Sequence, residues 1–324
     1  MPILRVHGRD LPVEPGETAL DALLRGGALV PNSCRAGACK SCLVRASAGT
    51  PPPAAQVGLK DTQRARGYFL ACVCRPEEDL TIADEDPTIA AEVTGVDMLS
   101  ADVVRVRMRP AAPFAYRPGQ FVTVLRPDGL ARSYSLASVP ELGEDLEIHA
   151  RVLPQGRMSG YLARELHIGD RLGLRGPSGD CFYVPGEPGR TLVLIGTGTG
   201  LAPLYGIARD ALHHGHTGPI TLIHGGLTAA GLYLGDTLAG MARERPGLRY
   251  VRCALHGEPS EGLEIGAIEA VAARLLPKLA GHKVYLCGDP ERVQILKKQS
   301  FMRGARMQDI LADAFVTAPS PAAA

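Results

Sequence analysis

Cys34-Arg-Ala-Gly-Ala-Cys39-Lys-Ser-Cys42 is the stretch that decides the fold of the first part of this sequence. Its three cysteines follow the spacing C-x4-C-x2-C, and 29 residues separate Cys42 from the next cysteine, Cys72. Small side chains fill the stretch, so that backbone N–H groups can close around sulfide ions. Thiolates at this spacing bind the two irons of a [2Fe–2S] cluster. We therefore predict that Cys34, Cys39, Cys42 and Cys72 are cluster ligands.

A zinc site and buried free thiols are the other interpretations of these cysteines. Structural zinc sites usually combine two short pairs such as C-x2-C, whereas the distant partner here is the single Cys72. Cys74, Cys181 and Cys253 match no ligand pattern, and we interpret them as ordinary small side chains.

Length and composition limit the class of protein. A chain of 324 residues favours two or three domains, and 45% hydrophobic with 21% charged residues indicates a soluble globular protein. The formal charge is +1 and no basic tract is present, so we expect no nucleic-acid partner. The N-terminus lacks a signal-like apolar core, and no apolar run approaches the ~20 residues of a membrane span. We expect a cytoplasmic protein without membrane contact, whose eight cysteines serve metal or redox chemistry rather than disulfides.

Residues 1–88 are predicted to form the first domain from short elements. Thr18 is a candidate N-cap and Gly26-Gly27 a stop signal for the first helix. The second helix is expected to deliver Cys72 at its far end, and Asp84–Pro87 is interpreted as a linker. The predicted strands are Ile3–Val6, Leu11–Val13, Leu43–Ala46 and Leu80–Ala83, and the predicted helices are Thr18–Leu24 and Asp61–Tyr68.

Residues 89–187 change to a pattern of strands. Val104–Arg109 and Leu146–Val152 alternate apolar and polar side chains with period two, which indicates half-buried strands. Gln120–Leu125, Arg132–Ala137 and Arg171–Leu174 add further short strands between Pro- and Gly-containing turns. Several short strands at this spacing predict a small antiparallel barrel.

Residues 188–318 alternate strands and helices, which favours a doubly wound α/β domain, and 319–324 form a frayed tail. Thr191–Ile195 is apolar without alternation, as in a sheet buried on both faces. The helix Ala202–His214 follows, and we interpret His213, His214 and His216 around its end as solvated rather than metal-binding. The other predicted strands are Ile220–Ile223, Tyr250–Cys253 and Val284–Cys287, and the other predicted helices are Asp236–Arg245, Ala267–Leu279 and Pro290–Met302.

The loop Gly196-Thr-Gly-Thr-Gly-Leu-Ala-Pro203 lies between a predicted strand and a predicted helix. Glycines there let the backbone approach a pyrophosphate, and the helix N-terminus supplies free N–H groups. A tight turn without a ligand is the alternative. The spacing is G-x-G-x-G rather than the Rossmann G-x-G-x-x-G, and His224–Thr228 offers no acidic residue for a ribose. An ordinary Rossmann dehydrogenase is therefore not expected.

Two motifs in the middle domain suit a flavin. In Arg132-Ser-Tyr-Ser135 the arginine suits a phosphate, the tyrosine can lie along an isoalloxazine or ribityl chain, and the serine can bond a flavin nitrogen. The Gly156-Arg-Met-Ser-Gly160 turn would present N–H groups to a pyrophosphate. Taken alone, Arg-x-Tyr-Ser is a common strand sequence, so its weight depends on its neighbours.

Several motifs in one order carry a family resemblance over roughly residues 2–316. They resemble the ferredoxin–NADP reductase superfamily, and with the cysteine-rich N-terminus the chain resembles the reductase components of bacterial aromatic-ring oxygenases. The resemblance implies a multidomain fold: an α+β β-grasp ferredoxin of the plant type (1–88), an antiparallel β-barrel FAD domain (89–187) and a doubly wound α/β NAD domain (188–318). The motifs are Pro118–Phe121, Arg132–Ser135, Gly156–Ser159, Gly176–Gly179, Gly196–Pro203 and Cys287–Pro290.

The resemblance also implies site residues. Ser135, Cys287 and Phe315 are the predicted catalytic residues, with Phe315 shielding the flavin; its alternative is a core aromatic that closes the last strand. Ala38 and Lys40 stand where ferredoxin loops often have glycine, although the ligand set is intact. The predicted FAD-binding residues are Arg132, Tyr134, Ser135, His149, Arg151, Gly156, Met158 and Ser159. The predicted NAD-binding residues are Gly196, Thr197, Gly198, Thr199, Gly200, Ala202, Pro203, Cys287, Gly288, Asp289 and Pro290.

The activity implied is electron transfer from NADH through FAD and the cluster to a separate protein, either a terminal oxygenase or an intermediary ferredoxin. No general acid or base is needed, and a monomer is expected. Reductases of diiron monooxygenases or deoxysugar pathways use the same modules, and an iron–sulfur redox sensor is the alternative from another class. NADPH is expected to be a poorer substrate than NADH, because His224–Gly235 contains no arginine or lysine.

Overall fold

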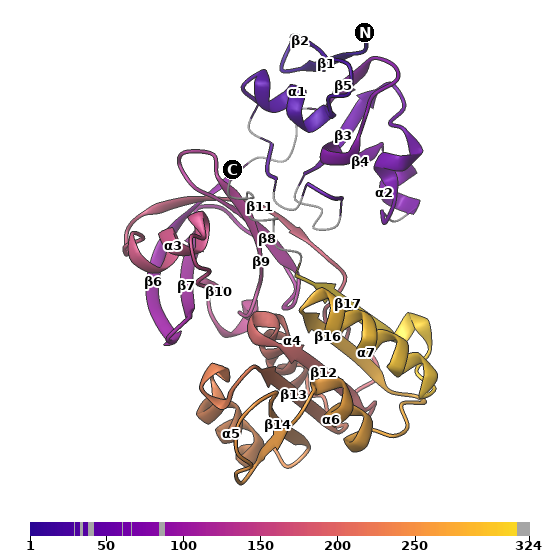
Figure 1. The fold of residues 1–324 in the computed structure, drawn as a ribbon. Helices are drawn as coiled ribbons and strands as arrows, with labels where there is room; N and C mark the ends of the chain where they lie inside the picture. The colour runs from indigo at the N-terminus through magenta and orange to yellow at the C-terminus, as the bar shows by residue number, and fades with distance from the viewer. Residues whose placement is uncertain are drawn as a thin grey trace.

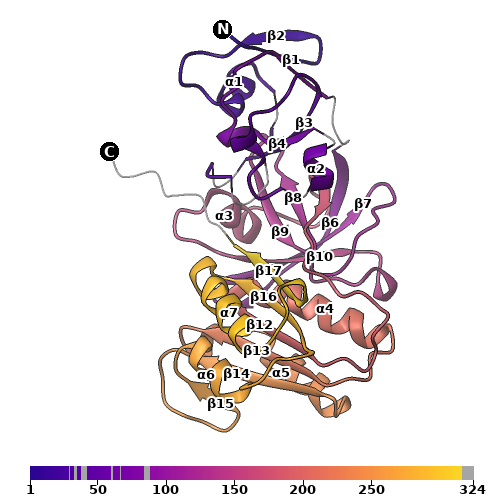
Figure 2. The ribbon, with the colours of Figure 1, turned by 90° about the vertical axis from the view of Figure 1, so that its right-hand side faces the viewer.

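The computed structural model shows three domains, each built around one β-sheet, stacked along the molecule (Figures 1 and 2). It describes residues 1–28, 30–32, 35–37, 42–59, 61–65, 67–83 and 88–315. The predicted ligands Cys34 and Cys39, the neighbouring Ala38 and Lys40, the linker Asp84–Pro87 and the tail 319–324 lie outside the described residues.

The first domain is a mixed five-stranded sheet in the order β2-β1-β5-β3-β4, with β1 parallel to β5. Thr18 caps the first helix as predicted, because its Oγ1 accepts a hydrogen bond from Asp21 N at 3.2 Å. That helix buries Leu20 and Leu23 in the domain core. The elements are β1 (Ile3–Val6), β2 (Arg9–Pro12), α1 (Ala19–Arg25), β3 (Leu43–Ala48), α2 (Asp61–Ala65), β4 (Tyr68–Leu70) and β5 (Leu80–Ile82).

Two predictions in this domain are wrong. The second strand of the first hairpin is Arg9–Pro12 rather than Leu11–Val13. The predicted helix Asp61–Tyr68 gives way to β4 at Tyr68, because Gly67 has φ +79° and its N–H bonds the Arg64 carbonyl at 2.9 Å. Cys72 therefore follows a strand rather than a helix, and it lies in a short 3₁₀ turn.

The second domain is a six-stranded antiparallel sheet in the order β10-β7-β6-β11-β8-β9. A bridge between Leu136 and Ile148 brings the two edges together, so the sheet curls into the predicted barrel. The strand β6, which the sequence analysis missed, buries alternate residues Ala91, Val93 and Gly95, but two of these are small, so the alternation is weak in the sequence. The elements are β6 (Ile89–Ser100), β7 (Val103–Pro110), β8 (Phe121–Leu125), β9 (Ala131–Ser135), β10 (Leu146–Arg151), α3 (Arg157–Arg164) and β11 (Arg171–Ser178).

The third domain is an all-parallel sheet in the order β15-β14-β13-β12-β16-β17 with helices on both faces (Figure 1). Leu192 and Leu194 of β12 join one core, and Val193 and Ile195 join the other, as expected for a strand buried on both faces. The strands are β12 (Leu192–Thr197), β13 (Ile220–Gly226), β14 (Leu248–Ala254), β15 (Leu263–Ile265), β16 (Lys283–Gly288) and β17 (Ile310–Ala314). The helices are α4 (Leu201–His213), α5 (Gly235–Glu244), α6 (Ile268–Leu275) and α7 (Pro290–Met302).

Helix α6 ends at Leu275 and not at the predicted Leu279, because Pro277 disfavours helical backbone at the residue before it. Short 3₁₀ turns complete the chain at Pro53–Gln56, Ala71–Val73, Pro140–Leu142, Gly198–Gly200, Ala229–Gly231 and Met307–Asp309. Within the described part of the chain, no helix combines the length and apolar character needed to cross a membrane.

The domains make close contacts with one another. Gly206 of α4 lies against the barrel so closely that a Cβ there would come within 3.1 Å of the Leu136 and Ala137 carbonyl oxygens. Arg132 of the barrel reaches the first domain and donates from Nη1 to the Asn32 carbonyl at 3.1 Å. The three sheets fall within the predicted domains, whose exact boundaries stay predictions.

Candidate functional site

The first part of the site is a pair of cysteines. Cys42 comes just before β3 and Cys72 lies in the 3₁₀ turn after β4; both are buried. A hydrogen bond with Cys42, together with one from the Gly37 backbone, lowers the pKa of the Cys72 thiol to about 6 against the opposing effect of burial. The two thiols therefore converge in a setting that stabilises thiolate, which fits an iron cluster.

Cys74 behaves differently although it is only two residues away. Its side chain is fully buried in the core, and burial raises the pKa of its thiol to about 12. The structure thus separates Cys74 from the Cys42–Cys72 pair, in agreement with its interpretation as an ordinary core side chain. The roles of all four predicted ligands stay predictions.

The motif Arg132–Ser135 occupies β9. Arg132 is half-buried, and Nη1 donates both to the Asn32 carbonyl at 3.1 Å and to its own neighbour Ala131 O at 2.7 Å. A guanidinium has five N–H donors, so these contacts leave capacity for phosphate oxygens. Burial raises the pKa of the Tyr134 phenol, so this side chain is neutral at ordinary pH. An arginine beside a neutral aromatic fits the phosphate and ring of a flavin.

Ser135 ends β9 and makes a contact that the sequence analysis missed. Its Oγ donates to Asp313 Oδ2 at 2.9 Å, across the gap between barrel and third domain. Asp313 belongs to β17, and two residues later Phe315 N donates to the Gly288 carbonyl at 2.8 Å. The structure therefore brings the C-terminal strand, Ser135 and the Gly288 loop into one region. Phe315 is half-buried there, and its role as a flavin shield stays a prediction.

The turn before α3 is built around Gly156. A Cβ at Gly156 would overlap Ser159 Oγ, which accepts a hydrogen bond from Leu153 N at 3.1 Å. Gly156 N itself donates to the Leu153 carbonyl at 3.0 Å, so amides further into the first turn are the ones that could face a phosphate. Met158 is buried in the barrel core.

Arg126 was missed by the sequence analysis and lies beside the same turn. Its Nη1 donates to the Arg157 carbonyl at 3.3 Å, and its guanidinium lies 4.5 Å from the centre of the Tyr161 ring. The side chain is mostly buried, at 21% exposure, and its Nη2 pairs with Asp128 Oδ2 at 3.0 Å, so the guanidinium is held in place beside the α3 N-terminus. No sequence motif marks this residue.

His149 and Arg151 on β10 have their side-chain polar groups engaged elsewhere. His149 is buried, with Nε2 2.8 Å from Glu147 Oε1 and Nδ1 3.1 Å from Tyr233 Oη of the third domain. Arg151 is half-exposed and its Nε lies 3.2 Å from Asp102 Oδ2. These contacts do not bring the two side chains to Arg132, and their part in FAD binding stays a prediction.

The dinucleotide loop lies at the switch point of the parallel sheet. β12 and β16 are neighbours, and chain connections leave in opposite directions beyond their carboxyl ends, where ligands bind in open α/β sheets. A Cβ at Gly200 would overlap the Cys287 carbonyl oxygen, and one at Gly288 would overlap Thr197 Oγ1. The Gly196–Pro203 and Cys287–Pro290 segments, which are both predicted to bind the dinucleotide, therefore lie against each other, and each contact requires a glycine.

Several side chains in these two segments serve the fold. Ala202 and Pro203 are buried in the first turn of α4, and Asp289 caps α7 by accepting a hydrogen bond from Arg292 N at 3.0 Å. Cys287 Sγ lies 3.6 Å from Cys181 Sγ, and burial raises the pKa of the Cys287 thiol. The backbone, rather than these side chains, is the part of the loops that suits a dinucleotide.

Comparison with known proteins assigns each of the three domains to a known domain family. A 2Fe-2S iron-sulfur cluster binding domain matches residues 4–77, an oxidoreductase FAD-binding domain residues 90–183 and an oxidoreductase NAD-binding domain residues 194–298. The reductase subunit of an aromatic O-demethylase from Amycolatopsis sp. is 37% identical over 305 residues, which cover 89% of this chain and 91% of the relative. The chain belongs to this family of iron–sulfur flavoprotein reductases.

Further relatives span nearly the whole reductase. The ferredoxin–NAD(P)+ reductase component of the naphthalene 1,2-dioxygenase system of Pseudomonas putida is 30% identical over 322 residues, covering 97% of this chain and 98% of the relative. The crystal structure of an Amycolatopsis cytochrome P450 reductase superposes with a TM-score of 0.71 at 35% identity, covering 97% and 99% of the two chains. The predicted family, fold class and enzyme class are confirmed. So are the three cofactors, a [2Fe–2S] cluster, FAD and a nicotinamide dinucleotide.

The residues fit these cofactors. The Cys42–Cys72 pair suits the iron–sulfur cluster, the β9 motif suits FAD, and the two glycine loops that contact each other suit the dinucleotide. When bound, FAD takes a hydride from the nicotinamide and releases its two electrons singly to the cluster. The reductase itself supplies binding, distance and electrostatics. Every residue assignment to a particular cofactor atom stays a prediction.

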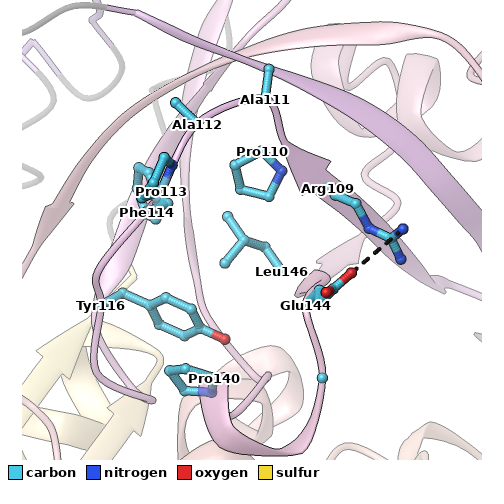
Figure 3. A pocket seen from close by; sticks show the side chains of 11 residues that line it. Arg109, Pro110, Ala111, Ala112, Pro113, Phe114, Tyr116, Pro140, Glu144 and Leu146 are labelled. Atoms are coloured by element: carbon cyan, nitrogen blue, oxygen red, sulfur yellow. Dashed lines mark ion pairs between the residues drawn. The ribbon is translucent and has the colours of Figure 1, made fainter.

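One cavity of the reductase lies outside this site. It measures about 410 Å³ and lies between the end of β7 and the Pro140–Leu142 turn, with Phe114, Tyr116 and Leu146 in its wall (Figure 3). An ion pair between Arg109 and Glu144, 3.6 Å apart, crosses its rim. None of the predicted site residues lines it, so the loops at the sheet's switch point identify the site better than cavity size does.

The three histidines at the end of α4 and just after it differ in their exposure to solvent. His213 and His214 are exposed as predicted, and His214 Nδ1 lies 3.0 Å from Asp210 Oδ1. The prediction for His216 is wrong, because it is buried with Nδ1 3.3 Å from Tyr183 Oη. No local pattern in the sequence indicates that His216 is buried, because its partner Tyr183 lies 33 positions earlier in the chain.

Proposed function

We propose that this reductase is the NADH-dependent component of an oxygenase system and delivers electrons to a separate oxygenase that acts on an aromatic compound. The observation that carries the proposal is the 3.1 Å contact between Arg132 Nη1 and the Asn32 carbonyl. It joins the flavin motif on β9 to the segment just before Cys34, so one chain holds both predicted cofactor sites next to each other. Electrons need not leave the chain between flavin and cluster, and the next acceptor is a separate protein.

The names of the relatives support an aromatic substrate for that acceptor. One relative serves an aromatic O-demethylase and another serves naphthalene 1,2-dioxygenase. A haem oxygenase is the second candidate acceptor, because the Amycolatopsis cytochrome P450 reductase matches 97% of this chain at 35% identity.

Anaerobic reduction of candidate oxygenases tests the proposal. The reductase and NADH are mixed with each oxygenase encoded near its gene, and reduction of the oxygenase iron is followed by its visible absorption. We expect rapid reduction of one such oxygenase by the native reductase and none by a Cys42→Ser variant, which lacks a cluster ligand. Equal, slow rates with both forms for every oxygenase would contradict the proposal.

The coenzyme preference for NADH rests on the end of β13. A 2′-phosphate usually needs a nearby arginine or lysine. His224 is fully buried and cannot reach a phosphate at the surface, while the Arg252 guanidinium on the neighbouring strand donates to the Glu261 and Gly262 carbonyls. Arg243 comes only in the last turn of α5. Steady-state comparison is the test, and equal or higher kcat/KM for NADPH would contradict this assignment.

We further propose a cytoplasmic monomer, because the eight cysteines suit metal or redox chemistry rather than disulfides and because one chain holds both predicted cofactor sites. Light scattering after size exclusion would measure the mass directly, with 34.2 kDa expected for one chain. A stable dimer at micromolar concentration would refute the monomer.

A further inference from the structure

A buried chain of polar side chains connects the barrel to the dinucleotide loop. It starts at Glu147 on β10, runs through His149 on the same strand, and crosses to Tyr233 of the third domain. The Tyr233 ring in turn packs edge-on against His224, whose Nε2 lies 3.2 Å from the Gly198 carbonyl of the loop. His149 and Tyr233 are 4% and 3% exposed, so water does not compete for these bonds.

The chemistry of the groups fixes the direction of every hydrogen bond. The Nε2 of His149 faces the Glu147 carboxylate at 2.8 Å and must carry the proton, so Nδ1 is the acceptor for the Tyr233 hydroxyl at 3.1 Å. Burial lowers the pKa of His149 and raises that of Tyr233 well above its ordinary value, which keeps both neutral. The hydrogens therefore point from the Tyr233 hydroxyl to His149 and from His149 to the Glu147 carboxylate.

His224 extends the contact to the middle of the loop. Its ring packs edge-on against the Tyr233 ring at 5.5 Å, and Nε2 lies 3.2 Å from the Gly198 carbonyl, to which it donates. Gly198 is the loop residue with φ +53°. His224 is fully buried, and burial lowers its pKa to about 4, so the neutral ring serves as a fixed donor. His224 therefore fixes the loop at Gly198, and its ring packs against that of Tyr233.

We propose that Tyr233, His149 and His224 are positioning residues that fix the dinucleotide loop relative to the flavin-side strand β10. The loop Gly196–Pro203 and β10 belong to different domains, and the successive contacts His149–Tyr233, Tyr233–His224 and His224–Gly198 join them. Such a link sets how the nicotinamide-binding backbone is oriented toward the flavin-binding barrel. The inference rests on the assignment of the loop to the dinucleotide and does not depend on the identity of the oxygenase.

Tyr233→Phe is the direct test, with Tyr183→Phe as the matched control. Tyr183, between β11 and β12, is also a buried tyrosine, at 4% exposure, and its hydroxyl and ring also contact a histidine, His216, but no hydrogen bond among the described residues joins it to the loop. Removing the Tyr233 hydroxyl leaves the buried His149 Nδ1 without its hydrogen-bond donor. We expect flavin reduction by NADH in stopped flow to slow by about tenfold, the size typical of one lost buried hydrogen bond.

Hydrogen exchange supplies a readout that is independent of activity. Amides of residues 196–203 should exchange faster in FAD-loaded Tyr233→Phe than in native reductase, and should be unchanged in Tyr183→Phe. His149→Leu should behave like Tyr233→Phe, whereas His149→Gln, which keeps a donor and an acceptor, should recover part of the rate. Equal behaviour of the two tyrosine variants, or unchanged exchange and flavin reduction in Tyr233→Phe, would overturn the proposal.

Calorimetric titration with NAD+ separates this inference from its premise. If the loop binds the dinucleotide, NAD+ affinity should fall in Tyr233→Phe together with the faster exchange. Faster exchange with unchanged NAD+ affinity would refute the positioning role, since the loop would then move without consequence for the coenzyme.

Discussion

Arg132 is a single side chain that lies between two predicted cofactor sites. Its place on β9 suits a flavin phosphate, and its contact with the Asn32 carbonyl at 3.1 Å reaches the segment before the cluster loop. Bidentate geometry makes arginine the preferred partner of phosphate, and lysine would not replace it equally. A change at this residue should therefore be felt first in FAD affinity.

Arg132→Ala should weaken FAD binding by about tenfold to a hundredfold, because a hydrogen bond to a charged group contributes roughly 1.5–3 kcal/mol. Calorimetry of FAD binding to the apoprotein measures the change. Arg107→Ala is the control, since Arg107 is a half-exposed arginine of β7 that pairs with Asp97 at 3.5 Å. Unchanged FAD affinity in Arg132→Ala would show that the motif is misassigned.

Gly200 offers an equally local test of the dinucleotide loop. A Cβ there would overlap the Cys287 carbonyl oxygen, and backbone must shift to relieve the overlap. Gly200→Ala should raise KM for NADH by about tenfold or more, a loss of 1.4 kcal/mol per factor of ten, while dithionite still reduces flavin and cluster. Gly189→Ala, at a position just before β12 with no atom within 4 Å, should leave KM unchanged. Equal KM values in all three proteins would remove the loop from coenzyme binding.

At the scale of single elements, β17 depends on a buried carboxylate at its start. Asp309 is 3% exposed and its Oδ2 accepts from Arg190 Nη2 at 2.8 Å and Arg306 Nε at 2.7 Å. Burial acts to raise the pKa of Asp309, but the two arginines outweigh it and hold the pKa below its ordinary value. The strand that this cluster fixes carries Asp313 to Ser135.

Asp309→Asn should destabilise the third domain by about 3 kcal/mol, as breaking a buried ion pair does. Since the folded-state pKa is lowered, the native carboxylate stabilises the fold fully above its unfolded pKa and loses this effect as pH falls through the folded value. The stability difference between native protein and variant should therefore be full at pH 6 and shrink below about pH 4. Unfolding followed by circular dichroism measures it, and a difference that is constant from pH 6 to pH 3 would contradict the role of Asp309.

Element prediction succeeded where the signal was local. The apolar run that became β12 and the Thr18 cap of α1 are local features, and both elements appear where expected. Predictions failed where a single backbone residue decided the outcome, as Gly67 did by ending α2 before β4. β17 was missed because its pattern is mixed and its place at the sheet edge depends on Asp309.

The candidate site divides in the same way. Cysteine spacing and glycine loops could be predicted, because ligand spacing and close backbone approach constrain the sequence itself. Asp313, Tyr233 and Asn32 could not be, since each acts through a partner 84 to 178 positions away and carries no motif. Long-range partners of this kind become visible only once the domains are placed against each other.

At the scale of the whole molecule, the reductase consists of three domains, and its predicted cluster and flavin sites lie in different domains. The first domain has its own core, which contains Cys42, Cys72 and Cys74, and the barrel core is distinct from it. A defect in the cluster should therefore leave the flavin and its reaction with NADH intact. Cys42 and Cys74 are both buried cysteines of one core, but only Cys42 bonds Cys72.

Cys42→Ser should abolish the cluster and leave FAD bound, because serine replaces a thiolate ligand with a poorer one for iron. NADH oxidation with ferricyanide, which needs only the flavin, should survive, while reduction of cytochrome c should fall at least about tenfold if it draws electrons from the cluster. Cys74→Ser should retain the visible absorption of the cluster and both activities, because the Cys74 thiol lies in the core away from the pair. Loss of ferricyanide activity in a folded, FAD-loaded Cys42→Ser protein would mean that the cluster domain also shapes the flavin site. The Arg132–Asn32 contact would then be a structural requirement for NADH oxidation rather than a path between two independent modules.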